Sequence, residues 1–140
     1  MVTYLRLIFG ITTFAFVSGL ALAQSSPAAR FEIFLSTVST DSDRALESLF
    51  AGSNIAHAKP LAWSEMKAQT KSALNTYGKP LGFEKINERD FTPSLKRLTY
   101  LQKFDAYPVV WHVLFYRAKD EWVANAVVVS DNVGVMLLGL

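Results

Sequence analysis

The chain has 140 residues, of which 51% are hydrophobic, with 14 basic and 12 acidic side chains and no cysteine. A net charge of +2 is too small to attract nucleic acid or an anionic membrane, so we expect neither as a partner. Without cysteine, disulfides, thiol catalysis and cysteine-ligated metals are excluded. The two histidines, His57 and His112, have no carboxylates at metal-ligand spacing. We therefore expect no metal and no cofactor.

The first 23 residues have the pattern of a secretory signal peptide. Arg6 supplies a positive charge, residues 7–22 are mainly apolar, and Ala21-Leu22-Ala23 matches the small-x-small cleavage pattern. We expect cleavage after Ala23 and a periplasmic or secreted protein that no longer contacts the membrane. The alternative is an uncleaved anchor, but the apolar run of about 16 residues is shorter than the roughly 20 that span a bilayer.

About 117 residues remain after this segment, enough for one core. We divide them into a short leader, 24–30, and a single domain, 31–140. Apolar residues recur with a helical period in the first half of this domain. The sequence predicts helices over 31–38, 41–50 and 64–77, with Ser64 as the cap of the third and a loop over 53–60.

In the second half of the domain the apolar residues alternate as in strands. Strands are predicted over 83–91, 95–104, 109–117 and 122–130, and a short fifth strand over 133–140. The strand 109–117 is apolar on both faces except for His112, which places it at the centre of a sheet. Helices followed by an antiparallel meander predict an α+β fold, with the helices on one face of a curved sheet of four to five strands.

The pattern also resembles a known superfamily. A helix ending in Tyr77-Gly78 precedes a meander in which Trp111-His112-Val113-Leu114-Phe115-Tyr116-Arg117 is followed by Asp120-Glu121-Trp122. This order resembles the cystatin-like, nuclear transport factor 2-like superfamily, especially its small exported bacterial members of unknown function. The resemblance implies a cone with a pocket between the sheet and the helices, and a homodimer through the outer sheet face. Because the superfamily contains both enzymes and binders, the activity stays open.

His112 is the candidate catalytic residue, because an imidazole can act as an acid or a base near neutral pH. Val110, Leu114 and Tyr116 share its side of the strand. In a cofactor-free isomerase, dehydratase or cyclase, Tyr100 or Tyr116 would donate a hydrogen bond to an enolate. The alternative is a structural histidine on a half-exposed sheet face, satisfied by a backbone or hydroxyl partner.

Aromatic residues in the meander are the candidate ligand-binding group. Trp111 and Phe115 share one face and are expected to contact the helices, while Trp122 pairs across strands. This pattern indicates either a hydrophobic core or a platform for a small apolar ligand. The candidate ligand-binding residues are Trp111, Tyr100, Tyr116 and Phe115.

Polar residues at two places in the chain each allow two interpretations. Asp105 and Tyr107 either polarise a carbonyl group or shape the turn before the central strand. Glu84, Glu88 and Asp90 alternate along the first strand, which predicts that they face one way. They indicate either a cation site or an edge strand that charges protect from aggregation.

Three functions follow from these patterns. The first is a non-enzymatic exported domain that binds a small apolar ligand or a partner protein as a homodimer. The second is a cofactor-free enzyme that uses His112, and it requires His112 and a tyrosine to point into one cavity. The third is a structural module of the cell envelope that docks through an exposed apolar patch on the outer sheet face.

Overall fold

The computed structural model describes residues 25–138. The predicted signal peptide lies outside these residues. The described elements are, in chain order, α1 (Pro27–Thr37), α2 (Ser42–Leu49), α3 (Ile55–Ala58), α4 (Pro60–Tyr77), β1 (Pro80–Thr92), β2 (Leu95–Phe104), β3 (Pro108–Tyr116), β4 (Val123–Ser130) and α5 (Val133–Leu137). Helices followed by an antiparallel sheet confirm the predicted α+β class. No helix within 25–138 has the length and apolar character needed to cross a membrane.

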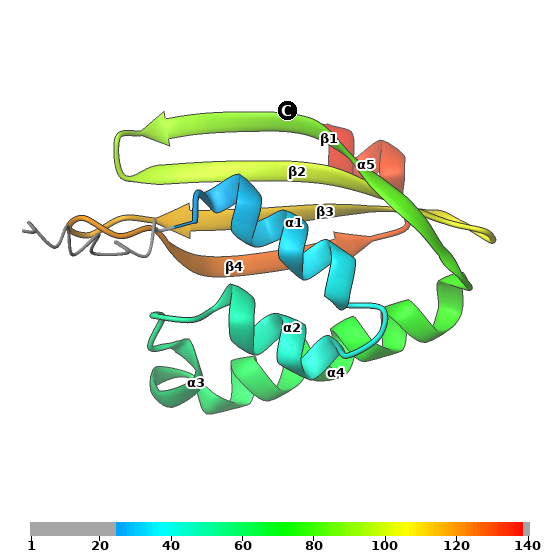
Figure 1. Ribbon diagram of the computed structural model, residues 1–140, viewed down its shortest axis with the longest axis horizontal. Coiled ribbons are helices and arrows are strands. Elements are labelled where there is room, and N and C mark those ends of the chain that lie inside the picture. The colour runs from blue at the N-terminus through cyan, green and yellow to red at the C-terminus, as the bar shows by residue number, and fades with distance from the viewer. Residues whose placement is uncertain (1–24, 139–140) are drawn as a thin grey trace, which may run out of the picture.

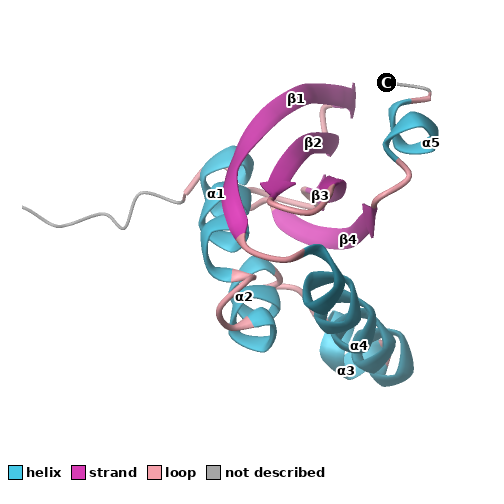
Figure 2. Cartoon of the chain, turned by 90° about the vertical axis from the view of Figure 1, so that its right-hand side faces the viewer, coloured by secondary structure: helices cyan, strands magenta, loops and turns pink. Residues whose placement is uncertain are grey.

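The sheet has the order β1-β2-β3-β4 with antiparallel neighbours throughout, so β3 lies inside the sheet and β1 at an edge, as predicted. Figure 1 shows α1 lying across the sheet, with α2 and α4 below it. In Figure 2 the sheet is curved, and α1 and α5 lie on opposite sides of it. We call the face that carries α1 the helix face and the other the outer face.

Helix α1 begins earlier than predicted. Ser26 caps it by accepting a hydrogen bond from the Ala29 N–H (3.2 Å), and Pro27 occupies the first turn, where its missing N–H costs nothing. Residues 27–30 of the predicted leader are therefore helical. The Ser-Pro start signal was present in the sequence, but it lies before the apolar stripe that begins at Phe31.

Helix α4 also begins before its predicted cap. It starts at Pro60, so Ser64 lies inside the helix, and the short helix α3 occupies part of the predicted loop 53–60. The buried side of α4 carries Thr70 and Tyr77. Proline at the first helical position is a signal for the start of a helix, and the prediction did not use it.

Aromatic packing fills the space between α1 and the sheet. Phe34 meets Trp111 edge to face at a centroid distance of 5.2 Å, and Phe31 meets Tyr100 in the same way at 5.3 Å. The Trp111 indole N–H donates to Gln102 Oε1 (2.9 Å), and Gln102 Nε2 donates to the Leu35 carbonyl (3.1 Å). These two hydrogen bonds supply partners for the buried polar groups of Trp111 and Gln102, as buried polar groups require.

The predicted fifth strand is wrong. Residues 133–137 form helix α5, which begins where Asn132 accepts a hydrogen bond from the Val135 N–H (3.3 Å). The Met136 carbonyl lies 2.8 Å from His112 Nε2, so α5 folds over the outer face rather than pairing with β4. An apolar run this short is compatible with either a strand or a helix. The cap by Asn132 favours the helix.

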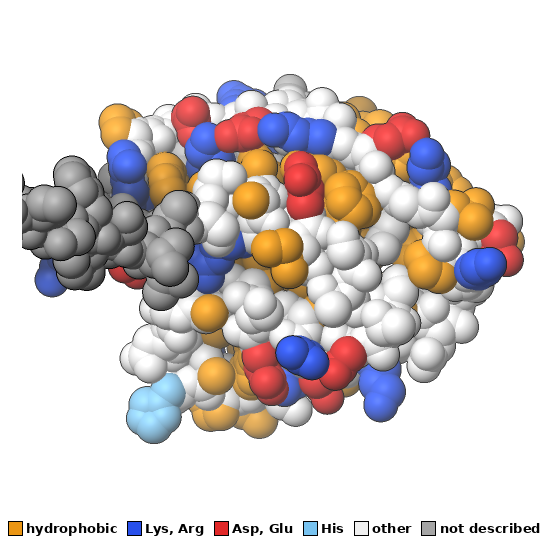
Figure 3. Space-filling view, in the orientation of Figure 1, with side chains coloured by type: hydrophobic (Ala, Val, Ile, Leu, Met, Phe, Trp, Pro, Cys, Tyr) orange, Lys and Arg blue, Asp and Glu red, His pale blue; other side chains and the backbone are white. Residues whose placement is uncertain are grey.

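Strand β1 lies at an edge of the sheet and carries the charges of Glu84, Glu88 and Asp90, as the edge-strand interpretation predicted. A register shift in mid-strand places Glu84 on the outer face and Glu88 and Asp90 on the helix face, so the predicted shared face is wrong. Glu84 pairs with Lys103 at 2.7 Å, while Glu88 and Asp90 pair with Lys96. Figure 3 shows acidic and basic side chains interspersed along this edge.

Asp105 shapes the turn between β2 and β3, as one of its two interpretations predicted. Its Oδ1 accepts from the Lys79 N–H (2.7 Å), and its own N–H donates to the Lys79 carbonyl (3.0 Å). The contact fixes the start of β1 against this turn. It requires Gly78, whose φ is +87° and whose missing Cβ would lie 2.0 Å from Asp105 Oδ1.

We expect Gly78→Ala to lower the free energy of unfolding by about 2 kcal/mol, because alanine strains a positive φ and displaces the Asp105 carboxylate. Denaturant unfolding measures this change. Gly134→Ala in α5 is the control, because its Cβ would meet only Asn132 Oδ1 at 3.9 Å. Equal stability of the two variants would contradict the proposed strain.

Candidate functional site

The outer face carries an apolar pocket of about 360 Å³, a volume typical of sites for small ligands. Within it, Phe91 is 42% and Val128 53% exposed, so large apolar surfaces face solvent. The pocket takes residues from every strand of the described sheet. It is lined by Phe91, Leu95, Arg97, His112, Leu114, Ala126 and Val128. We call it the outer-face pocket.

Strand alternation separates this pocket from the core. On β3, Trp111, Val113 and Phe115 point to the helix face and are fully buried, so His112 and Leu114 point to the outer face. The register then aligns the outward residues in two rows across β2, β3 and β4. The rows are Arg97, Leu114 and Ala126 in one, and Thr99, His112 and Val128 in the other.

His112 has a hydrogen-bond partner on each ring nitrogen. Nε2 lies 2.8 Å from the Met136 carbonyl, which can only accept, so Nε2 carries the proton. Nδ1 then accepts from the Thr99 hydroxyl at 2.8 Å. Burial lowers the pKa of His112 and the charge of Arg97 lowers it further, whereas the Met136 contact acts in the opposite direction. The alternative of a histidine satisfied by backbone and hydroxyl partners is confirmed.

The tyrosines expected to act with His112 do not lie beside it. Tyr100 is buried on the helix face, where its hydroxyl donates to Glu32 Oε1 (2.8 Å). Burial and the Glu32 hydrogen bond raise the pKa of Tyr100. Tyr116 shares the face of His112 but is four residues away, roughly 13 Å along an extended strand. The expected pair of His112 and Tyr100 is therefore wrong, because the sheet separates them.

Three of the four candidate ligand-binding residues belong to the core. Trp111, Tyr100 and Phe115 are each 1% exposed or less. Trp111 lies at the bottom of a smaller cleft of about 260 Å³ between α4 and β4. Tyr116, at 45% exposed, is the one candidate of the four with a large exposed surface. The space between the helices and the sheet is thus mainly packed core rather than the open cone that the resemblance implied.

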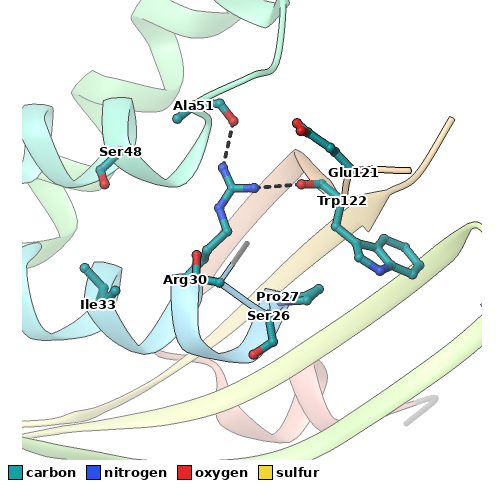
Figure 4. A pocket seen from close by; sticks show the side chains of 9 residues that line it. Ser26, Pro27, Arg30, Ile33, Ser48, Ala51, Glu121 and Trp122 are labelled. Carbon is teal, nitrogen blue, oxygen red and sulfur yellow. Dashed lines mark hydrogen bonds between the residues drawn. The ribbon is translucent and has the colours of Figure 1, made fainter. Parts of the chain in front are cut away.

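A second pocket, of about 380 Å³, surrounds Arg30 at one end of α1. The Arg30 guanidinium donates to the carbonyls of Trp122 (2.7 Å), Ala51 (2.7 Å) and Leu49 (3.3 Å), as Figure 4 shows for the first two. Burial lowers the pKa of Arg30, and Glu121 opposes this shift. The guanidinium therefore joins α1 to the segment after α2 and to the β3–β4 connection.

Arg30 was not among the predicted site residues, because it lies within the assumed leader. The sequence feature that could have indicated its role is a basic residue on the same side of α1 as Pro27 and Phe34, which are both buried. A cation on an apolar helix side needs polar partners, and the ends of other elements supply carbonyls. We interpret this pocket as structural, since its cation is already engaged by the backbone.

No family model, no curated protein and no solved structure matches this chain. Among residues 25–138, no group of three or more histidine, aspartate or glutamate side chains is placed to hold a metal ion. The function must therefore be inferred from the geometry of the pockets.

We expect Arg30→Gln to lower the free energy of unfolding by about 2–3 kcal/mol, because the partly buried carbonyls of Trp122 and Leu49 lose a charged donor. Thermal or denaturant unfolding measures the change. Arg44→Gln, at an exposed site in α2, is the matched control and should stay within about 0.5 kcal/mol of the unmodified chain. A similar loss in both variants would argue against the bridging role of Arg30.

The lowered pKa of His112 makes the fold sensitive to acid. Below the ordinary pKa of 6.5, the unfolded chain binds this proton more readily than the folded chain. The stability that neutral His112 contributes is present above that pH and is lost as the pH falls toward the folded pKa.

We expect Arg97→Gln to raise the His112 pKa, measured by NMR titration of the ring protons. An unchanged pKa would show that Arg97 exerts no charge effect.

Proposed function

We propose that this chain is a non-enzymatic binding domain, exported from the cell, and that the outer-face pocket binds a small apolar ligand. The observation that supports the proposal is the apolar pocket itself, on the sheet face that α1 and α2 leave uncovered. Exposed hydrophobic surface in a small domain costs free energy unless something covers it. The helix face already has its cover in the aromatic core.

The partners of His112 favour binding over catalysis. Its Nδ1 lone pair accepts from Thr99 and its Nε2 proton is donated to Met136. A general base needs a lone pair directed at the substrate. The neutral imidazole therefore serves as part of the pocket wall and as the anchor of α5. An enzymatic role would require His112 to exchange one of these partners for a substrate.

Helix α5 lies on the same face of the sheet as the pocket. The Met136 contact holds it against β3, and Val135 and Leu138 are 60% and 77% exposed. A second copy of the chain or a partner protein would cover the same apolar surface, as the envelope module requires. We favour a small ligand because the residues line an open, mainly apolar depression of about 360 Å³.

Binding of the neutral fluorescent probe N-phenyl-1-naphthylamine tests the proposal. We expect saturable binding, and we expect Val128→Asn to weaken it about fivefold, because the pocket loses apolar contact worth about 1 kcal/mol. Leu61→Asn is the control, since Leu61 is 80% exposed on α4 and does not line the pocket.

Two results would reject the proposed ligand site. One is the absence of saturable binding by a folded monomer. The other is an equal loss of affinity in Val128→Asn and Leu61→Asn, which would mean that the probe binds exposed hydrophobic residues without selecting the pocket. The molecular mass from light scattering, recorded on the same samples, shows whether a second copy covers the outer face.

A further inference from the structure

We propose that the ligand of the outer-face pocket is a neutral apolar molecule with a carbonyl group, and that this carbonyl replaces the Met136 carbonyl on His112 Nε2 as the ligand moves helix α5 aside. The inference rests on the proposed function. It names the class of ligand, and it makes α5 a competitor of that ligand for one polar atom of the site.

His112 belongs both to the pocket and to the contact with α5. Its ring lines the outer-face pocket, and its Nε2 proton is donated to the Met136 carbonyl at 2.8 Å. The residues beside it in the lining include Leu114, Ala126 and Val128, which offer only apolar side chains. Because Nε2 carries a single proton, a ligand acceptor that reaches His112 takes the place of the Met136 carbonyl.

Thr99 prepares the imidazole for this exchange. Its hydroxyl lies 2.8 Å from His112 Nδ1, and Thr99 is fully buried. Because Nδ1 accepts this hydrogen bond, the proton stays on Nε2 when the Met136 carbonyl leaves. At this position the site therefore offers a donor and no lone pair, which favours a ligand that carries an acceptor.

Helix α5 is weakly held against the sheet. It has five residues, fewer than the roughly 12–15 that an isolated helix needs, and none of them is buried. Among residues 25–138, one hydrogen bond joins α5 to the sheet, the bond from His112 to Met136. Figure 2 shows α5 on the outer side of the sheet, connected to β4 by a loop. An element with so few buried contacts opens at a low cost in free energy.

The ligand covers apolar surface that α5 leaves exposed. Phe91 and Val128 in the pocket are 42% and 53% exposed, while Val135 and Leu138 are 60% and 77% exposed. Moving α5 therefore loses little apolar contact, whereas filling the pocket buries apolar area. The cost of the exchange lies in the His112 N–H, which would be left without an acceptor beside an apolar ligand. A carbonyl group on the ligand removes this cost.

Valerophenone and pentylbenzene test the inference, because they differ only in a carbonyl that replaces one CH2 group. Each is added at saturation, as judged by displacement of N-phenyl-1-naphthylamine from the full chain. The readout is NMR-detected hydrogen exchange of the Val135 and Met136 amides, which both donate to Asn132 at the start of α5. We expect valerophenone to accelerate this exchange about threefold or more, and pentylbenzene to leave it unchanged.

Removal of the α5 cap provides a second measurement. We expect Asn132→Ala to tighten valerophenone binding by about fivefold, because an uncapped α5 competes less well for His112, and to leave pentylbenzene binding unchanged. Ser26→Ala is the matched control, since Ser26 caps α1 through the same kind of hydrogen bond and does not line the outer-face pocket. It should change the affinity of neither ligand.

The outcomes separate the two proposals. If the probe binds but valerophenone does not displace it, or if the two ligands affect the α5 amides equally, the carbonyl inference is overturned and the apolar site stands. An equal effect of Asn132→Ala on both affinities overturns it as well. If the probe itself does not bind, the proposed function fails and the inference fails with it. The exchange measurement uses the unmodified chain, so it decides the inference even if Asn132→Ala disturbs the fold.

Discussion

The two-residue alternation of β3 is the constraint on which the rest of the structure depends. Trp111, Val113 and Phe115 point to the helix face and close the core. His112 and Leu114 consequently point to the outer face and form the floor of a pocket. A shift of the strand by one residue would exchange the two sets. Core and candidate site are therefore specified by the same nine-residue strand.

The Gln102 bridge makes this arrangement specific. Trp111 brings an indole N–H into the core, and Gln102 accepts it while donating to Leu35 of α1. An unsatisfied buried donor costs about 1–3 kcal/mol, so the bridge favours one register and one placement of α1. On the other face, His112 connects Thr99 to α5 in the same manner. On each face, a polar side chain of the sheet is thus hydrogen-bonded to the backbone of a helix that packs there.

Residue periodicity predicted the elements whose burial is one-sided. The alternation of apolar residues predicted the class of the fold and the central strand. The structural partners of His112 were expected because a polar group in an apolar run needs hydrogen-bond partners. What failed depended on single local contacts, or on contacts between distant parts of the chain. The Asn132 cap made a helix of the predicted fifth strand, and the bulge in β1 moved Glu84 to the other face. Arg30 fell within the assumed leader, and its carbonyl partners are 19 to 92 residues away, so no local pattern indicated them.

An NMR titration of the methyl-labelled protein with N-phenyl-1-naphthylamine tests most directly whether the outer face is the ligand site. We predict chemical-shift changes at the methyl groups of Leu114 and Ala126, which line the pocket, and unchanged methyl signals of Val109 and Val113, which are fully buried in the core. Changes confined to Val109 and Val113, or to methyl groups of α4, would place the ligand on the helix face and contradict the outer-face assignment.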